Sequence, residues 1–313
     1  MSILCIGATP AAQRVMVFQA VTVGAVNRAV ATHDGAAGKA VNVAKVLKIL
    51  GEDPILIGLF GGQRGKDLQE QLCGLGIQTD SITVPAETRL CTTIIDQGQA
   101  VQTELVEESK AVEAAIYEEL IAIVRTRAKN CPAAIMSGTL TPGAPASFYA
   151  RCVGAANENR ALSIVDARGP ALLEALPVRP GVVKPNRAEL AATVGGELST
   201  DKSLGDAMRA LHERGAQRVI ITAGADPVMA FDGQRFWRIT APRVTTVNPI
   251  GSGDAFTAGL TIGLLRGDEL GEACRLASAA GAANALSLMP GELELKDVKR
   301  LAGEVKVEQI SPE

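Results

Sequence analysis

The stretch VTTVNPIGSGDAFTAGL, residues 244–260, sets two glycines around a serine and places an aspartate directly after them. Residues 254–267, DAFTAGLTIGLLRG, predict a helix that begins at this turn. Gly251 and Gly253 allow backbone conformations that other residues resist, and they let a ligand approach the main chain closely. Such a turn directs N–H groups and the helix dipole at one spot, which suits an anion or a phosphoryl group in transfer. Asp254 in the first turn also complements the dipole, so a purely capping role is the competing interpretation.

The chain around this turn alternates short apolar runs with longer helical patterns. The runs are SILCIG, PILIGLFG, AAIMSG, LSIVDA, GVVKPN and RVIITAG. They are rich in Val, Ile and Leu without clean alternation, as is typical of parallel strands that are covered on both faces. The helical patterns between them are AVNVAKVLKILG, GKDLQEQLCGLG, AVEAAIYEELIAIVRTRAKN and DKSLGDAMRALHERG. This alternation predicts a doubly wound, mostly parallel α/β sheet whose ligands collect at the carboxyl ends of the strands.

Two segments interrupt the alternation. Residues 13–35 and 89–108 are rich in β-branched residues, alternate in part, and carry a central glycine, so they indicate hairpin-like strands. Each is inserted between core units, and together they are expected to form a small separate sheet over the strand ends. The predicted organisation is an α/β core of residues 1–12, 36–88 and 109–313 with a β-strand lid of residues 13–35 and 89–108.

The composition excludes several classes of protein. Of the 313 residues, 47% are hydrophobic and 21% charged, which is typical of globular proteins. The net charge of -3, the 3% aromatic content and the lack of a Lys/Arg block give no support for a nucleic-acid or membrane partner. Six scattered cysteines and two histidines argue against a zinc site or a disulfide framework. The N-terminus lacks a basic n-region and no apolar run reaches about 18 residues, so a cytoplasmic protein is expected.

Two further segments carry groups suited to nucleotide phosphates, although neither a Walker motif nor a G-x-G-x-x-G motif occurs in the expected place. The segments are VVKPNRAEL (182–190) and IITAGADPVMAF (220–231). Asn186 and Glu189 fall where a strand ends and a helix begins, and their oxygens suit Mg²⁺ and its waters. The same two residues have the form of a capping box, which explains them locally and is compatible with a metal role.

Nine segments in order along the chain together resemble the ribokinase-like carbohydrate kinase family, closest to its 1-phosphofructokinase and tagatose-6-phosphate kinase branch. They are VGAVNR, GAAGKAVNVAKVLKILG, AETRLCTTIID, QTELVEE, MSGTLTPGAPASFY, VKPNRAEL, TAGADP, NPIGSGDAFTAG and AGAANALS. The resemblance implies a ribokinase-like doubly wound sheet flanked by helices, with a small inserted β-sheet lid. It also implies ATP-dependent phosphoryl transfer with Mg²⁺.

The resemblance further implies a role for individual residues. Asp254 would be the general base, and Gly251, Ser252 and Gly253 would form the anion hole. The residues on the nucleotide side would be Lys184, Asn186, Thr222, Gly224 and Asn284, with Asn186 and Glu189 holding the metal through water. The residues on the acceptor side would be Gln13, Arg28, Gly38, Lys39, Asn42, Arg89 and Ser137. Among these, Arg28, Lys39 and Arg89 would clamp the phosphate that the substrate already carries.

The acceptor side departs from the family pattern. Thr9 and Gln13 stand where the branch has Asn and Asp, Ala37 and Ala40 where it has Gly, and Cys91 and Val106 where it often has Asn. Gln13 accepts hydrogen bonds but also donates, and it carries no charge. Because Arg28, Lys39 and Arg89 match the phosphosugar branch, a kinase of a sugar phosphate, of the fructose 1-phosphate or tagatose 6-phosphate type, is nevertheless the first hypothesis. A kinase of an unphosphorylated sugar, nucleoside or polyol and a non-catalytic binding protein are the alternatives. Lid strands with one apolar face also predict a homodimer through the lid.

Overall fold

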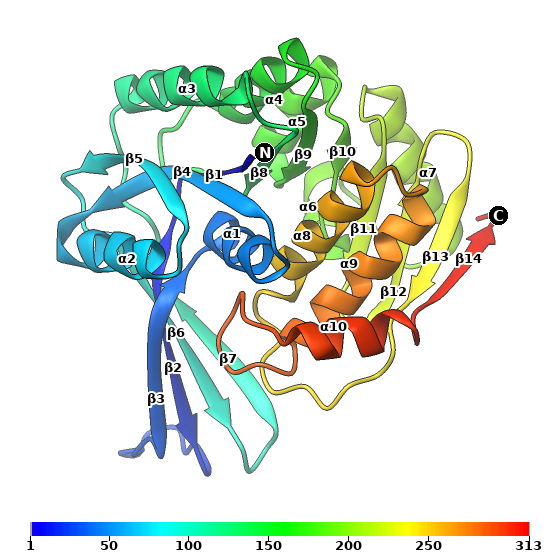
Figure 1. The fold of residues 1–313 in the computed structure, drawn as a ribbon. Coiled ribbons are helices and arrows are strands. Elements are labelled where there is room, and N and C mark those ends of the chain that lie inside the picture. Colours follow the sequence, from blue (N-terminus) through cyan, green and yellow to red (C-terminus); the bar gives the residue numbers. More distant parts are fainter. Residues whose placement is uncertain (1, 313) are drawn as a thin grey trace.

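The computed structural model describes residues 2–312 and contains two β-sheets (Figure 1). The large sheet has ten strands in the order β14-β13-β12-β11-β10-β9-β8-β1-β4-β5. They are β1 (Ser2–Gly7), β4 (Asp53–Gly61), β5 (Gln78–Val84), β8 (Ala133–Ser137), β9 (Leu162–Asp166), β10 (Val182–Val183), β11 (Val219–Ala223), β12 (Asp226–Phe231), β13 (Phe236–Thr240) and β14 (Lys306–Ile310). The strands from β5 across to β11 are parallel, and β12 to β14 extend the sheet with antiparallel pairs.

Strand β1 lies at the point where the strand order reverses. Its neighbours are β4 on one side and β8 on the other, and the chain continues outward from each of them. Open α/β sheets bind ligands outside the carboxyl ends of their strands at such a point. Residues at or just beyond these strand ends therefore meet at one edge of the sheet. They include Thr9, Ser137, Asp166, Lys184 and Thr222.

Helices cover both faces of the large sheet. One face packs against α1 (Lys39–Ile49), α2 (Gly62–Gly74), α8 (Ser252–Leu265), α9 (Leu270–Asn284) and α10 (Leu295–Ala302), which lie on the near side in Figure 1. The other face packs against α3 (Ala114–Ala128), α4 (Phe148–Glu158), α5 (Gly169–Ala175), α6 (Arg187–Val194) and α7 (Asp201–Glu213). A short 3₁₀ helix, Leu176–Val178, directly follows α5. Successive residues of β1 point to opposite faces of the sheet. Ile3 and Cys5 pack in the core on one face, and Leu4 and Ile6 pack in the core on the other. This burial on both sides explains the unbroken apolar runs.

The predicted doubly wound, mostly parallel sheet is confirmed. Each of the six apolar runs contains one parallel strand, and each of the four helical patterns contains one helix, now seen as α1, α2, α3 and α7. The strand predicted at GVVKPN is short, because Pro185 lacks an N–H group and cannot continue the hydrogen-bond ladder. Within residues 2–312, no helix is both long enough and apolar enough to cross a lipid bilayer.

The small sheet, with the order β3-β2-β6-β7, projects from the core and confirms the expected inserted sheet (Figure 1). Its strands are β2 (Ala11–Phe18), β3 (Ala31–Ala37), β6 (Arg89–Asp96) and β7 (Val101–Val106). Val15, Val17 and Ile95 pack against Met289, in the loop after α9. The Gln102 amide also donates to the Val247 carbonyl, with 3.2 Å between nitrogen and oxygen. The small sheet therefore contacts the loops that border the carboxyl edge of the large sheet.

The strand register decides which side chains of the small sheet face the core. Gln13 of β2 pairs with Cys91 of β6, and Thr93 of β6 pairs with Glu104 of β7. Side chains alternate along a strand, so Gln13, Cys91, Thr93 and Glu104 share one face, and Arg89 shares it too. This face of the small sheet is turned toward a cavity between the small sheet and the α/β core.

Candidate active site

A cavity of about 270 Å³ lies between the carboxyl edge of the large sheet and the inner face of the small sheet. Its lining from the small sheet is Ala11, Gln13, Ala37, Arg89, Cys91 and Glu104, and its lining from the core is Gly38, Lys39, Asn42, Asp166, Lys184, Asn186, Glu189, Thr222, Ile250, Gly251, Gly253 and Asp254. Most of the residues singled out in the sequence therefore meet in one place, although they come from segments far apart in the chain.

The Gly-Ser-Gly-Asp turn forms the start of α8. Gly251 is the N-cap residue and has a left-handed conformation, with φ 86°. A Cβ atom at this position would lie 2.9 Å from the Gly291 nitrogen and 2.9 Å from Pro290 Cβ. Glycine is therefore required here twice, by the backbone conformation and by the close approach of the loop after α9.

The main-chain donors of the turn divide into two groups. The Ser252 N–H donates to the Pro249 carbonyl and the Asp254 N–H to the Gly251 carbonyl. Among the residues that the structure describes, none accepts a backbone hydrogen bond from the Gly251 or Gly253 N–H. These two groups, at the positive end of the α8 dipole, are available to an anion.

Two buried asparagines hold the turn in place. The Asn248 carbonyl oxygen accepts from the Ile250 N–H at 3.1 Å. The Asn284 amide donates to the Ile250 carbonyl at 2.9 Å and lies 3.3 Å from the Ser252 hydroxyl, while its oxygen accepts from the Gly291 N–H. Both side chains are fully buried, so their hydrogen bonds fix the shape of the turn.

Asp254 lies at the cavity with its carboxyl group almost fully buried. The Asn42 amide donates to Asp254 Oδ2 at 2.7 Å. Burial is the main cause that raises the pKa of Asp254, and the nearby Asp166 adds to it; against the lowering effect of Lys39, Asn42 and Lys184, the resulting pKa is about 7. A carboxyl group with a pKa close to neutral pH is suited to take up a proton during a reaction.

A buried carboxylate, Asp166 at the end of β9, joins two lysines. Lys184 Nζ lies 3.0 Å from Asp166 Oδ2, and Lys39 Nζ lies 3.2 Å from Asp166 Oδ1. Lys39 also reaches Glu189 Oε1 at 3.1 Å. A Cβ atom added to Gly253 would lie 3.8 Å from Lys184 Nζ, so this ammonium group faces the turn. The two lysines thus bring positive charge to the side of the cavity that contains the free N–H groups.

The pKa shifts in this cluster follow from burial and opposite charge. Burial by itself would raise the pKa of Asp166, but Lys184 and Lys39 outweigh it and hold that pKa below its usual value. Burial would likewise lower the pKa of Lys39, but Asp166, Glu189 and Asp254 outweigh it and raise the pKa. Both groups are therefore charged at neutral pH.

Asn186 and Glu189 form the capping box that their spacing predicts at the start of α6. The Asn186 side chain accepts from the Glu189 N–H at 2.8 Å, and Glu189 Oε2 accepts from the Asn186 N–H at 2.9 Å. Among residues 2–312, no group of three or more His, Cys, Asp or Glu side chains is arranged to hold a metal ion. The carboxylate and amide oxygens at this edge nevertheless fit Mg²⁺, which binds few protein ligands and keeps its waters and the substrate phosphates.

The acceptor side of the cavity contains a cation without an acidic partner. The Arg89 guanidinium donates from Nη2 to the Thr9 carbonyl at 3.1 Å. Its Nε–H is buried and has no hydrogen-bond partner among the described residues. Lys39 and Lys184, in contrast, are both held by carboxylates. Arg89 is therefore the cavity-lining cation of residues 2–312 that is most open to an anionic ligand.

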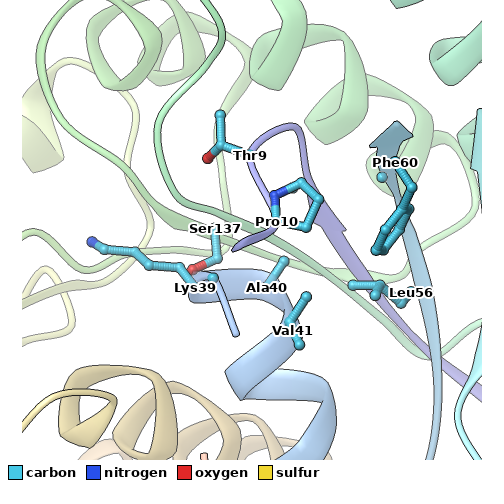
Figure 2. A pocket seen from close by; sticks show the side chains of 11 residues that line it. Thr9, Pro10, Lys39, Ala40, Val41, Leu56, Phe60 and Ser137 are labelled. Atoms are coloured by element: carbon cyan, nitrogen blue, oxygen red, sulfur yellow. The ribbon is translucent and has the colours of Figure 1, made fainter. Parts of the chain in front are cut away.

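Gly38 lines the cavity, and Ser137 lies behind it in a small side pocket that both residues share around the first turn of α1. Figure 2 shows Ser137 beside the start of the Lys39 side chain, whose ammonium group points away from Leu56 and Phe60. This side pocket has a volume of about 10 Å³, room for no more than one water molecule. The Ser137 hydroxyl is buried and has no partner among the described residues. Gly38, the N-cap of α1, has φ 105°, and its position lies against Thr9 and Pro10.

Three residues that the resemblance placed at the ligands do not line this cavity. Arg28 is exposed in the loop between β2 and β3 and does not line the cavity. Gly224 is exposed in the turn between β11 and β12, at the rim. Asn284 lies behind the turn, where its amide and carbonyl groups already have partners in the protein. The sequence interpretation also did not select Asp166 or Asn248. The available signal for Asp166 was its place at the end of the apolar run LSIVDA, where a strand edge meets ligands.

Comparison with known proteins agrees with this fold. Residues 2–293 match the pfkB family of carbohydrate kinases. A tagatose-6-phosphate kinase from Staphylococcus epidermidis is 32% identical over 288 residues, which are 91% of this chain and 92% of that protein.

Two solved structures share the fold. A possible 1-phosphofructokinase from Thermotoga maritima has a TM-score of 0.91 at 23% identity, over 99% of this chain and 100% of that one. Arabidopsis thaliana ribokinase, complexed with ribose and ATP, has a TM-score of 0.77 at 20% identity, over 96% of this chain and 98% of that one. With the family match over most of its length and a relative at 32% identity, this chain belongs to the pfkB family of carbohydrate kinases.

Proposed function

We propose that this carbohydrate kinase transfers the γ-phosphoryl group of ATP to a hydroxyl group of a sugar that already carries one phosphate. The observation that carries the proposal is the position of Asp254, a buried carboxyl group beside free N–H groups and two lysines in one cavity. The similarity to tagatose-6-phosphate kinase supports an acceptor of the tagatose 6-phosphate or fructose 1-phosphate type.

In this mechanism Asp254 is the general base. Its carboxylate takes the proton of the acceptor hydroxyl as the oxygen attacks the γ-phosphorus and the bond to the β-phosphate oxygen breaks. Asn42 orients the carboxylate through the 2.7 Å hydrogen bond to Oδ2. General-base assistance of this kind is worth about 10²–10⁴ in rate.

Other groups of the cavity would stabilise the negative charge on the transferring phosphoryl group. The N–H groups of Gly251 and Gly253 and the ammonium groups of Lys39 and Lys184 would stabilise the oxygens of the γ-phosphoryl group. Because these donors are fixed before the reaction, little reorganisation is needed in the transition state. The small sheet covers the cavity and limits the access of water, which would otherwise hydrolyse ATP.

ATP is the phosphoryl donor that membership of this family implies. We assign Mg²⁺ to the edge formed by Asn186, Glu189 and Asp166, where oxygens of the protein could hold it directly or through water. When bound with ATP, the ion would neutralise charge on the phosphates.

We assign the phosphate of the acceptor to Arg89. This residue has N–H groups to spare, whereas Lys39 is already held between Asp166 and Glu189. Lys39 shares Asp166 with Lys184 and its charge acts on Asp254, so we assign it to the transferring phosphoryl group. The three-cation clamp inferred from the resemblance reduces to Arg89 within this subunit.

An ADP-release assay against a panel of sugar phosphates and the matching neutral sugars tests the proposal, with Arg89→Met as the diagnostic variant. Wild-type protein is expected to turn over with at least one phosphorylated acceptor. Arg89→Met is expected to raise KM for that acceptor about 10- to 100-fold, because hydrogen bonds to charged groups contribute about 1.5–3 kcal/mol. The KM for ATP should stay within about threefold of the wild-type value, because Arg89 lies on the acceptor side.

Other outcomes of this assay decide between the alternatives. Turnover with neutral sugars only, unaffected by Arg89→Met, would identify a kinase of unphosphorylated acceptors, in line with the uncharged Gln13. Absence of stimulated ADP release with every acceptor would leave a binding protein. An Arg64→Met variant is a matched control, since Arg64 is paired with Glu107 and does not line the cavity.

We also propose a homodimer that forms through the small sheet. The loop between β2 and β3 exposes Val23 and Val26 at 98% and 82%, and β7 exposes Val101 and Leu105 on the face opposite the cavity. Exposed aliphatic side chains gathered on one element are typical of an interaction surface. Light scattering after size exclusion should give twice the 32.5 kDa chain mass for wild type and a monomer for Leu105→Glu. Leu265→Glu, at the end of α8, should leave the mass unchanged, and a monomeric wild type would contradict the proposal.

A further inference from the structure

The acceptor side of the cavity displays hydrogen-bond acceptors that have no donor. The Asn42 amide donates to Asp254, which leaves Asn42 Oδ1 buried without a partner. The Gln13 amide donates from Nε2 to the Thr93 hydroxyl at 2.8 Å, which directs its Oε1 away from that bond as an acceptor. Sugar hydroxyl groups are the donors that such oxygens match.

Glu104 adds a carboxylate to this set. It lines the cavity from β7, where it pairs directly across the strands with Thr93, the partner of Gln13. It makes no hydrogen bond or ion pair with any residue between 2 and 312. Its surroundings raise its pKa by partial desolvation, and the charge of Arg89 opposes this only in part. Glu104 is exposed on the edge strand β7, so its carboxylate is open to a ligand that enters the cavity.

Glu104 and Arg89 lie at different levels along the small sheet. Arg89 and Thr93 lie on the same face of β6, four residues apart, which corresponds to about 13 Å along the strand. The backbone positions of the two residues are thus offset along the strands, while the charge of Arg89 still acts on the Glu104 carboxylate. Since both residues line the cavity, an acceptor whose phosphate binds Arg89 can place a hydroxyl group at Glu104.

We propose that Glu104 is a specificity-determining residue for the acceptor. Its carboxylate accepts a hydrogen bond from an acceptor hydroxyl and repels a second anionic group at that end. The site therefore selects sugars with a single phosphate over sugar bisphosphates and phosphorylated sugar acids. This assignment rests on the proposed function, because it takes the cavity to be the acceptor site of a phosphosugar kinase.

Steady-state kinetics of Glu104→Gln and Glu104→Ala test the assignment, with Glu108→Gln as the matched control just beyond β7 that does not line the cavity. Glu104→Ala is expected to raise KM for the acceptor about tenfold or more, as for the loss of a hydrogen bond to a charged group. The kcat and the KM for ATP should change less than about threefold, because Glu104 binds ground state and transition state alike. Both Glu104 variants should lower the inhibition constant of a sugar bisphosphate at least about fivefold, because the repulsion is removed.

The outcomes separate this assignment from a structural role and from the proposed function. Equal acceptor KM and equal bisphosphate inhibition in wild type and variants overturn it, as does a matching change in Glu108→Gln. A fall in thermal stability accompanied by equal losses in both KM values and in kcat also overturns it. If wild type phosphorylates no acceptor, the proposed function fails. In that case the binding of sugar monophosphates is measured by calorimetry. Weaker binding to Glu104→Ala than to wild type supports the assignment. Equal affinity of the two proteins, or no binding to wild type, overturns the assignment.

Discussion

Asp254→Asn is expected to lower kcat by about 10²–10⁴-fold while leaving the KM for ATP within about threefold of the wild-type value. The change removes the proton acceptor but keeps the size of the side chain, and Asn42 can still donate to the remaining oxygen. The ADP-release assay with the best acceptor measures both constants. Far-ultraviolet circular dichroism and the thermal midpoint show whether the variant is folded.

The pH dependence gives a second test of the same assignment. A general base acts only when deprotonated, and the pKa of Asp254 is raised to about 7, mainly by burial. The wild-type kcat/KM for the acceptor should therefore rise with pH and reach half of its plateau near pH 7, because this ratio reports the free enzyme. The residual activity of Asp254→Asn should lack this rise. An unchanged pH profile in the variant, or a kcat equal to that of the exposed control Asp53→Asn, would falsify the role of base.

Asp166→Asn is expected to lower both the free energy of unfolding and the turnover. Asp166 is the carboxylate that neutralises Lys184 and shares Lys39 with Glu189. Its loss leaves the ammonium of Lys184, which is 3% exposed, buried without an opposite charge. Breaking a buried ion pair from one side costs about 3–5 kcal/mol. Urea denaturation at pH 7 measures the change in stability, and the ADP-release assay measures the loss of turnover.

A double variant separates stability from catalysis. Asp166→Asn with Lys184→Met removes the uncompensated charge together with the carboxylate, so most of the lost stability should return. Turnover should remain low, because Lys184 and the position of Lys39 are both lost from the phosphoryl side. Recovery of full activity in the double variant would show that the Asp166 cluster is only structural.

The dependence of the free energy of unfolding on pH in the acid range tests whether Asp166 is charged in the folded protein. Lys184 and Lys39 hold the pKa of this carboxyl below its usual value despite burial. A depressed pKa contributes stability that is fully present above the unfolded-state pKa and is lost as the pH falls through the folded-state value. The stability difference between wild type and Asp166→Asn should therefore be constant near neutral pH and shrink only below about pH 4.

Local features of the site could be read from the sequence because they depend on neighbours within a few residues. The Gly-Ser-Gly-Asp turn begins a helix, and Asn186 with Glu189 caps another, as their spacing predicts. The alternation of apolar runs and helical patterns likewise predicted the parallel core, because a strand that is buried on both faces is apolar along most of its own length. The inserted small sheet was predicted for the same reason, from its change to partly alternating residues.

The partners of the charged groups could not be predicted in this way. Lys39 and Asp166 are 127 residues apart, and they meet only because the start of α1 and the end of β9 lie at the same edge of the large sheet. The resemblance placed Lys39 in the clamp on the acceptor phosphate, and nothing in the sequence indicated its ion pairs with Asp166 and Glu189. The internal hydrogen bonds of Asn284 and the exposed position of Arg28 likewise depend on how distant loops pack.

The sequence by itself therefore determined the fold class, the inserted small sheet and the placement of an acid in the first turn of a glycine-started helix. Its periodicity and turn residues record the local conformation and burial of each segment. Only the tertiary structure decided that Asp166 joins Lys39 to Lys184, that Arg89 is left without an acidic partner, and that Glu104 faces the cavity. The reason is physical: ion pairing and desolvation depend on distances between segments, and those distances are set by strand order and register.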